Sequence, residues 1–210
     1  MANISSNPPD GLFCVGLSHK TTDLALREKI HIRPAALPAA LDDLRQSLNI
    51  PEAVLLSTCN RFELYALTGR DDGAGWIARR AAEDSSRVET LLTTWRGIDA
   101  VRHLFSVAAG LEAQIIGETQ ILGQVKDAYE SARSAGMTGP VTNVLFQRAI
   151  AAGKRVRTET KLAETPVSVS SVAVRLCEKI FGRLSGRSVL VVGAGEISCL
   201  AAEHLHERGA

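Results

Sequence analysis

Residues 54–65 read Val54-Leu55-Leu56-Ser57-Thr58-Cys59-Asn60-Arg61-Phe62-Glu63-Leu64-Tyr65. The apolar run that opens this stretch predicts a short buried strand, and the apolar segment 62–67 predicts a second one. Cys59 then lies on the turn between two strands, close to the fixed positive charge of Arg61. A nearby cation favours the thiolate form of cysteine, so this turn is a candidate site for a nucleophilic thiol. From this stretch alone, a buried core cysteine explains Cys59 equally well.

The composition is that of an ordinary soluble globular protein, with 45% hydrophobic and 22% charged residues. A chain of 210 residues can bury a core in one large domain or in two small ones. Lys+Arg 24 against Asp+Glu 23 gives no global basic field, so a nucleic-acid contact would need a local patch. The sequence shows no signal peptide and no apolar run long enough to span a membrane, which predicts a cytoplasmic protein.

The cysteines are far apart and form no C-x-x-C pair, which argues against a zinc site and against a disulfide scaffold. They are Cys14, Cys59, Cys177 and Cys199. His204 and His206 face different sides of an expected helix and make a poor metal pair. We therefore expect reduced thiols and no bound metal.

The first two thirds of the chain predict an α+β fold, in which a small antiparallel sheet carries helices on one face. The expected strands are 12–17, 54–56, 62–67 and 90–95, and the expected helices are 24–29, 35–48, 76–82, 100–109 and 121–135. Two more long helices, 141–161 and 167–181, are expected to connect domains. Helix 141–161 carries a local basic cluster that could contact tRNA phosphates or a cofactor, or be a solvated helix face. Its residues are Arg148, Lys154, Arg155, Arg157 and Lys161.

The C-terminal segment has a different pattern. Residues 188–192 form a β-branched and leucine run, as expected of a strand covered on both faces. A G-x-G-x-x turn and a helical pattern follow, which is the dinucleotide-binding fingerprint. The expected cofactor-binding residues are Gly193, Ala194, Gly195, Glu196, Ile197 and Ser198, with Ser198 standing where the fingerprint has Gly or Ala. This segment predicts the first βα unit of a Rossmann-type domain that is incomplete at Ala210, and hence a truncated chain.

Several longer motifs resemble the glutamyl-tRNA reductase family in order and spacing. They are Gly16-Leu17-Ser18-His19-Lys20-Thr21, the stretch 56–65, Gly117-Glu118-Thr119-Gln120-Ile121-Leu122-Gly123-Gln124-Val125-Lys126, Gly153-Lys154-Arg155-Val156-Arg157-Thr158-Glu159-Thr160, and Val167-Ser168-Val169-Ser170. The resemblance divides the chain into a disordered N-terminus (1–10), a catalytic glutamyl-tRNA-binding domain with its following helices (11–160), a connector helix (161–184) and the start of an NADPH-binding domain (185–210).

The resemblance implies a reaction. Family members reduce glutamyl-tRNA(Glu) with NADPH to glutamate-1-semialdehyde, the first step of five-carbon-route tetrapyrrole (5-aminolevulinate, porphyrin, haem) biosynthesis. Cys59 matches the nucleophile that forms an enzyme thioester, a role that suits sulfur because a thiolate is both a good nucleophile and a good leaving group. The partners implied by the resemblance are the tRNA, glutamate-1-semialdehyde aminomutase and, for the full-length family, a second copy in a homodimer, whose C-terminal dimerisation domain the truncated chain lacks. No membrane association is implied.

The resemblance also assigns further site residues. Those expected to hold the substrate are Thr58, Asn60, Arg61, Glu118, Thr119, Gln120 and Gln124, and a guanidinium such as that of Arg61 can grip a carboxylate with two parallel hydrogen bonds. His103 matches a histidine important for activity, whose step is unassigned. Ala113 stands where the family commonly has a serine, so a hydroxyl is missing there.

Two other hypotheses stay open. In the first, the truncated chain only binds glutamyl-tRNA or a partner, or hydrolyses the ester, without transferring hydride. An ordinary Rossmann dehydrogenase acting on a small molecule fits residues 188–210 alone, but it leaves the motifs around Cys59 and Glu118 unexplained.

Overall fold

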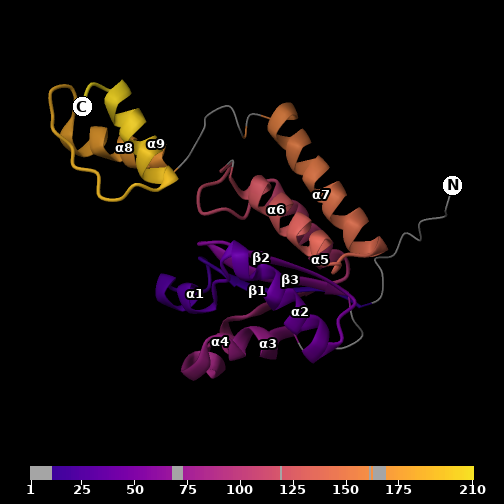
Figure 1. Cartoon of the computed structure of the whole chain (residues 1–210). Coiled ribbons are helices and arrows are strands. Elements are labelled where there is room, and N and C mark those ends of the chain that lie inside the picture. The colour runs from indigo at the N-terminus through magenta and orange to yellow at the C-terminus, as the bar shows by residue number, and fades with distance from the viewer. Residues whose placement is uncertain (1–10, 68–72, 119, 161, 163–168) are drawn as a thin grey trace.

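The computed structural model describes residues 11–67, 73–118, 120–160, 162 and 169–210. Its centre is a four-stranded antiparallel sheet with the strand order β2-β3-β1-β4 (Figure 1). The strands are β1 (Leu12–Ser18), β2 (Glu52–Ser57), β3 (Arg61–Leu67) and β4 (Thr93–Arg96). The expected antiparallel sheet is confirmed, although the last strand begins later than predicted because residues 85–91 form a helix.

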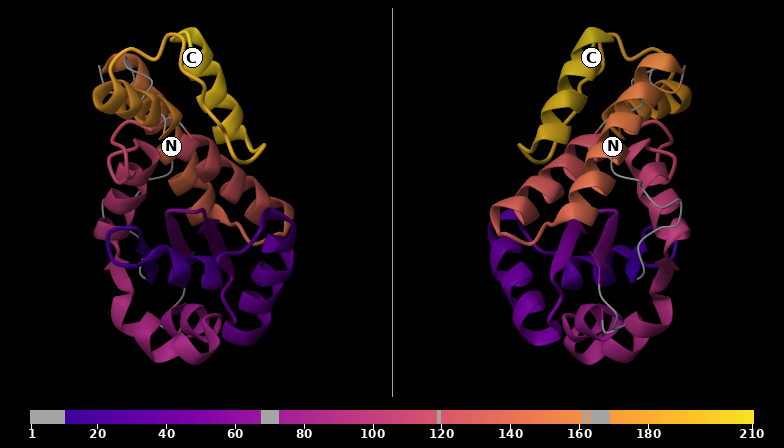
Figure 2. Two further views of the ribbon diagram at one scale, coloured as in Figure 1. Left: turned by 90° about the vertical axis from the view of Figure 1, so that its left-hand side faces the viewer. Right: turned by 90° about the vertical axis from the view of Figure 1, so that its right-hand side faces the viewer.

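Helices cover both faces of this sheet, as Figures 1 and 2 show. One face carries α1 (Leu24–Ile30), α2 (Leu37–Leu48), α3 (Gly73–Arg79) and α4 (Ser85–Leu91), with short 3-10 turns at Pro34–Ala36 and Ala82–Asp84. The other face carries α5 (Ile98–Ala108), α6 (Gln120–Ser134) and α7 (Pro140–Glu159). The prediction of helices on one face was wrong. The strands β1 and β3 are buried along nearly their whole length, and a sheet buried on both faces needs cover on both.

Successive side chains of β3 point to opposite faces of the sheet, so the strand presents different residues to the two helical layers. Leu64 lies toward α3. A Cβ atom on Gly73 of that helix would lie 3.1 Å from the Leu64 side chain and 3.0 Å from the side chains of Phe13 and Val15. Arg61, Glu63 and Tyr65 therefore point to the opposite face, toward α5 and α7. Polar and charged groups on this strand are thus gathered under one pair of helices.

Helix α7 belongs to the main core, which corrects the prediction that this region only connects domains. Its residues Leu145, Phe146 and Ala149 are buried in the same cluster as the sheet. At Gly153 a Cβ atom would lie 2.5 Å from the carbonyl oxygen of Ala108, so only glycine allows α7 to approach α5 this closely.

The C-terminal helices α8 (Val169–Phe181) and α9 (Glu196–Glu207) pack on each other through a separate small cluster of Val174, Leu184 and Leu205. Residues 188–192 are not a strand, and Leu190 and Val192 are each 87% exposed. The prediction of a buried strand was wrong for this structure, since a parallel strand needs hydrogen-bonded neighbours and the described residues offer none. The glycine turn and the helix after it are present, with Gly195 as the N-cap of α9.

We find no helix in the described part of the chain that is long and apolar enough to cross a bilayer.

Candidate active site

The turn between β2 and β3 presents Cys59 to solvent. Thr58 holds this turn, because its hydroxyl oxygen accepts hydrogen bonds from the backbone N–H groups of Asn60 (3.2 Å) and Arg61 (3.1 Å). The Thr58 N–H donates to the Arg61 carbonyl at 2.8 Å. With its hydroxyl engaged in this way, Thr58 positions the cysteine, which is exposed at the tip of the turn.

The loop after β1 and helix α1 brace the same turn from the side. The Arg27 Nε–H donates to the Cys59 carbonyl at 3.0 Å, and the His19 backbone N–H donates to the Asn60 carbonyl at 2.8 Å. Both carbonyls of the turn are therefore satisfied by residues more than thirty positions away. The motif 16–21, which carried no assigned role in the sequence, thus helps to fix the direction of the thiol.

A cavity of about 320 Å³ opens beside the thiol, along β2, which is an edge strand of the sheet. It is lined by His31, Pro34, Leu37, Leu55, Leu56, Ser57, Thr58, Cys59, Gln124, Asp127, Ala128 and Ser131. We call it the β2-edge cavity. Two predicted site residues from distant parts of the chain, Cys59 and Gln124, meet in its wall.

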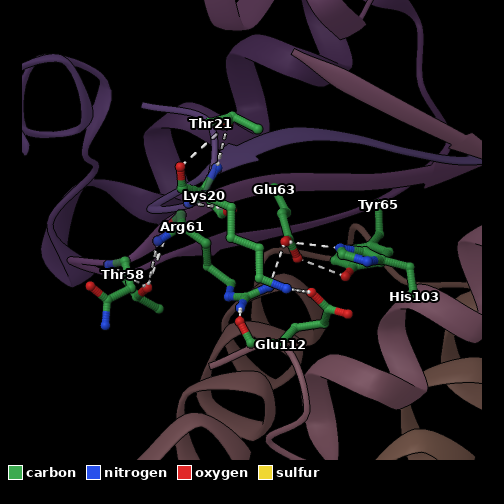
Figure 3. Close-up of polar contacts among 10 residues, drawn as sticks. Lys20, Thr21, Thr58, Arg61, Glu63, Tyr65, His103 and Glu112 are labelled. Atoms are coloured by element: carbon green, nitrogen blue, oxygen red, sulfur yellow. Dashed lines mark hydrogen bonds and ion pairs between the residues drawn. The ribbon is translucent and has the colours of Figure 1, made fainter. Parts of the chain in front are cut away.

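A buried polar network lies under the sheet face that carries Arg61 (Figure 3). The Arg61 Nη1–H donates to Glu63 Oε1 at 2.8 Å, and the Tyr65 hydroxyl donates to Glu63 Oε2 at 2.7 Å. His103 Nε2 lies 3.0 Å from the same Oε1 atom. The side chains of Arg61 and Glu63 are only 2% and 1% exposed, so this ion pair is withdrawn from water.

The electrostatics of the network keep Glu63 ionised. Burial alone would raise the pKa of Glu63, but the hydrogen bond with His103, the positive charge of Arg61 and the hydrogen bond from Tyr65 together hold that pKa below its usual range. The His103 ring is fixed on its other side by Trp95, with ring centroids 3.7 Å apart and planes 9° from parallel. The Glu63 carboxylate thus fixes the edge of the His103 ring, and the Trp95 indole packs on its face.

Gly16 leaves the space in which the Glu63 side chain lies. The two residues are paired across β1 and β3, and a Cβ atom on Gly16 would come within 2.8 Å of Glu63 Cγ and 2.3 Å of the Phe62 carbonyl oxygen. A side chain there would displace the carboxylate or part the strands.

Cys14 completes the buried cluster, since ligand-type atoms of Cys14, Glu63 and His103 lie within 4.8 Å of one another. Burial raises the pKa of the Cys14 thiol well above its usual range, as does the neighbouring charge of Glu63. Arg61 already supplies a positive charge to the carboxylate. We therefore interpret Cys14 as a protonated thiol packed in the core.

The loop 110–118 closes over Arg61. The Glu112 carbonyl accepts a hydrogen bond from Arg61 Nη2, and the Glu112 carboxylate pairs with Lys20 Nζ at 2.5 Å (Figure 3). Glu118 ends this loop, and burial raises its pKa while the nearby Arg61 charge opposes that rise. Gln120 begins α6, and Thr119 lies outside the described residues. Ala113 is buried at 7% exposure.

Arg61 and His103 are therefore joined through Glu63, whereas His103 lines a different cavity from Cys59. Arg102 and Glu112 also line that second cavity, which has a volume of about 460 Å³.

The expected cofactor residues 193–198 lie at the turn before α9 and in its first turn. In the basic cluster, Arg155 pairs with Glu159 at 3.0 Å, and Lys161 lies outside the described residues.

Three residues near the turn had no predicted role. Glu63 was quoted within its motif, and its spacing of two from both Arg61 and Tyr65 already places all three on one strand face. His31 lies in the β2-edge cavity, where Nδ1 is 2.9 Å from Ser57 Oγ. His19 has a buried Nδ1 atom with no hydrogen-bond partner among the described residues, and burial lowers the pKa of its imidazole, as does the charge of Arg61.

Known proteins share this arrangement of elements. Residues 15–160 match the family model described as the N-terminal domain of glutamyl-tRNA(Glu) reductase, and residues 175–210 match that of shikimate/quinate 5-dehydrogenase. Glutamyl-tRNA reductase from Magnetococcus marinus is 48% identical over 203 residues, covering 94% of this chain and 48% of that protein. The enzyme of the same name from Stenotrophomonas maltophilia is 46% identical over 197 residues, covering 93% of this chain and 45% of that protein.

The solved structure of glutamyl-tRNA reductase from Methanopyrus kandleri superimposes with a TM-score of 0.66 at 38% identity, covering 96% of this chain and 48% of that one. The fold that carries the thiol-bearing turn thus matches the N-terminal domain of one family over residues 15–160. The chain belongs to the glutamyl-tRNA reductase family. It spans about half the length of the relatives it matches.

Proposed function

We propose that this chain carries out the thioester-forming half of the reduction of glutamyl-tRNA(Glu) to glutamate-1-semialdehyde, a step in tetrapyrrole biosynthesis. The observation that carries the proposal is the exposed Cys59, held on a braced turn at the wall of a cavity. The family membership supplies the substrate, because the matched relatives are named for it.

In the first step the Cys59 thiolate attacks the carbonyl carbon of the glutamyl ester. A carbon–sulfur bond forms, the bond to the ribose oxygen breaks, and that oxygen leaves with the electron pair and takes up a proton from water. Glutamate is then held on the enzyme as a thioester, and the tRNA is free. Sulfur suits this step since it can be expelled again when the thioester is reduced.

Arg61 is proposed to recognise the glutamyl group, with Glu118 close enough to feel its charge, and the family resemblance adds Thr119, Gln120 and Gln124 to the substrate-binding residues. Its guanidinium is held in place by Glu63, and Glu63 is held in turn by His103 and Tyr65. We infer that His103 acts through Glu63 to position Arg61, since its Nε2 atom is committed to that carboxylate. Asn60 and Thr58 contribute by fixing the turn.

Residues 193–198 are proposed to bind NADPH. Gly193 adopts a φ of 116°, and at Gly195 a Cβ atom would meet nothing within 4 Å, so the backbone at the N-terminus of α9 is open to a pyrophosphate. NADPH, when bound, supplies the hydride that reduces the thioester and releases the aldehyde and the thiolate. Transfer of the product to an aminomutase and homodimer formation by the full-length protein remain predictions of the family resemblance.

One experiment tests the thioester. The chain is incubated with tRNA carrying radiolabelled glutamate, quenched in acid, and digested for peptide mapping. We expect label on the peptide that contains Cys59, no label on Cys59→Ser, and normal labelling of the control Cys199→Ser, which alters another exposed thiol. Equal labelling of the Cys59→Ser protein would refute the nucleophile.

A second candidate function is thioester formation followed by hydrolysis, without hydride transfer. The exposed, unpaired segment 188–192 favours it, because a dinucleotide site needs the strand and its neighbours to be in place. The same incubation with NADPH decides between the two. Free glutamate without semialdehyde supports the second candidate for this chain, and semialdehyde formation excludes it.

A further inference from the structure

We propose that a cavity between α2 and α3 binds a phosphate group, at a site separate from the thiol and from the network around Arg61. The cavity has a volume of about 400 Å³ and is lined by Asp43, Ser47, Trp76, Arg79 and Arg80. We call it the α2–α3 cavity. Both helices cover the sheet face opposite to α5 and α7 (Figure 1), and the cavity shares no lining residue with the cavities beside Cys59 and His103. The site is therefore independent of the thioester chemistry.

The α2–α3 cavity carries two positive charges that no ion pair neutralises. Neither Arg79 nor Arg80 forms an ion pair with an acidic residue in the described part of the chain. Arg87, on the neighbouring helix α4, instead pairs with Asp23 at 2.8 Å. Two guanidinium groups at one cavity suit a phosphate, because phosphate offers several acceptor oxygens and up to two negative charges.

Arg80 is held in place by an aromatic ring. Its guanidinium carbon lies 5.2 Å from the centroid of the Trp76 ring. Trp76 is only 3% exposed, and its Nε1–H donates to Asp43 Oδ2 at 2.7 Å, so the ring itself is fixed. A guanidinium that already rests on a fixed indole loses less conformational entropy when an anion binds, and this strengthens binding.

The surroundings of Arg80 also favour an anion. Burial lowers the pKa of the Arg80 guanidinium, while the charge of Asp43 opposes that fall. The Asp43 carboxylate faces other partners, since Oδ2 accepts from Trp76 and Oδ1 lies 3.3 Å from the Ser47 hydroxyl. The charge of Arg80 is thus partly withdrawn from water without a salt-bridge partner, and a bound anion supplies the missing counter-charge.

The size of the α2–α3 cavity allows more than a bare ion. Its volume falls within the range of about 300–1,000 Å³ that is usual for small-molecule pockets. The phosphate can therefore belong to a nucleotide, or to the backbone of an RNA that passes over the surface. Both sources present the same group to Arg79 and Arg80, and the experiment separates them.

The test follows the indole N–H signal of Trp76 by NMR while inorganic phosphate is added at constant ionic strength. The chain has two tryptophans, so its spectrum contains two indole signals, and Trp76→Phe identifies the one to follow. Trp95 stacks on His103 at the other sheet face and serves as the internal reference. We expect phosphate to shift the Trp76 signal to saturation and to leave the Trp95 signal unchanged.

Matched variants locate the effect. Arg79→Gln and Arg80→Gln should each weaken phosphate binding about tenfold, the cost of losing a hydrogen bond from a charged group. The control Arg87→Gln removes the same charge outside the cavity and should bind phosphate like the parent. Asp43→Asn keeps an acceptor for the Trp76 N–H and removes a negative charge from the wall, so it should tighten binding several-fold. Dispersed amide spectra confirm that each variant is folded.

Adenosine monophosphate and a short single-stranded RNA without a terminal phosphate are titrated in the same way. Tighter binding of the RNA assigns the site to a backbone phosphate, and tighter binding of the monophosphate assigns it to a nucleotide. If phosphate leaves the Trp76 signal in place, or if Arg79→Gln and Arg80→Gln bind phosphate as Arg87→Gln does, the phosphate site is refuted. These measurements use no glutamyl ester, so their outcome is separate from that of the thioester experiment.

Discussion

Removing the charge of Glu63 should destabilise the whole N-terminal domain. In Glu63→Gln the shape is nearly kept, but the Arg61 guanidinium, 2% exposed, loses its counter-charge. Breaking a buried ion pair by removing one partner costs about 3–5 kcal/mol. Since about 1 kcal/mol shifts the melting temperature by about 2–4 °C in a chain of this size, we expect a fall of about 6–20 °C in thermal unfolding followed by circular dichroism.

The control is the same substitution in an exposed pair. Glu159 pairs with Arg155 one turn away on α7, with side chains 57% and 74% exposed, so Glu159→Gln should leave the melting temperature nearly unchanged. The double variant Arg61→Met/Glu63→Gln should recover part of the loss, because no charge is then left buried. If Glu63→Gln had the same melting temperature as Glu159→Gln, the claim that Arg61 and Glu63 form a buried, stabilising ion pair would be wrong.

Three further predictions concern stability and the loop over Arg61. Because the pKa of Glu63 is held below its usual range, its stabilising effect is complete above the pKa of an unfolded carboxyl group and is lost as the pH falls through the lower folded value; urea unfolding between pH 7 and 3 should show this acid loss, reduced in Glu63→Gln. Gly16→Ala should destabilise the sheet, since the new Cβ meets Glu63 and Phe62, while Gly123→Ala on α6, with nothing within 4 Å, should stabilise by about 0.5–1 kcal/mol; a Gly16→Ala protein as stable as the parent would contradict the contact. Lys20→Gln breaks only a half-exposed pair and should change the unfolding free energy by less than about 1 kcal/mol, yet it should speed amide hydrogen exchange in 110–118; unchanged exchange would show that Lys20 does not hold the loop.

The thiol-bearing turn could be predicted from the sequence because everything that makes it is local. An apolar run, small polar residues and a second apolar run specify two strands and their connection, and the hydroxyl of Thr58 acts within three residues. The period of two along β3 likewise puts Arg61, Glu63 and Tyr65 on one face. Local patterns of this kind are read correctly without knowing what lies across the fold.

The partners of those residues could not be predicted, because they come from distant segments. Nothing near Glu63 in the sequence indicates that His103, forty positions away, will meet its carboxylate, or that Trp95 will stack on that histidine. The error at 188–192 has the same origin. A β-branched run states a preference for extended backbone, but a strand exists only where another strand accepts its hydrogen bonds.

Arg61 shows how the sequence and the structure together narrow the chemistry. The sequence indicates a carboxylate-binding guanidinium, while the structure shows one whose Nη1 is engaged by Glu63 and whose Nη2 is engaged by the Glu112 carbonyl. A two-pronged grip on a glutamyl carboxylate needs two parallel N–H groups, and Glu63 is too deeply buried to release its own. If the proposed function holds, we expect the glutamyl carboxylate to displace the neutral Glu112 carbonyl. That exchange replaces a neutral acceptor with a charged one, which binds a guanidinium more strongly, and the half-exposed Lys20–Glu112 pair opposes it only weakly. Under the proposed function, we therefore expect binding of the glutamyl group to Arg61 to be accompanied by outward movement of the loop 110–118.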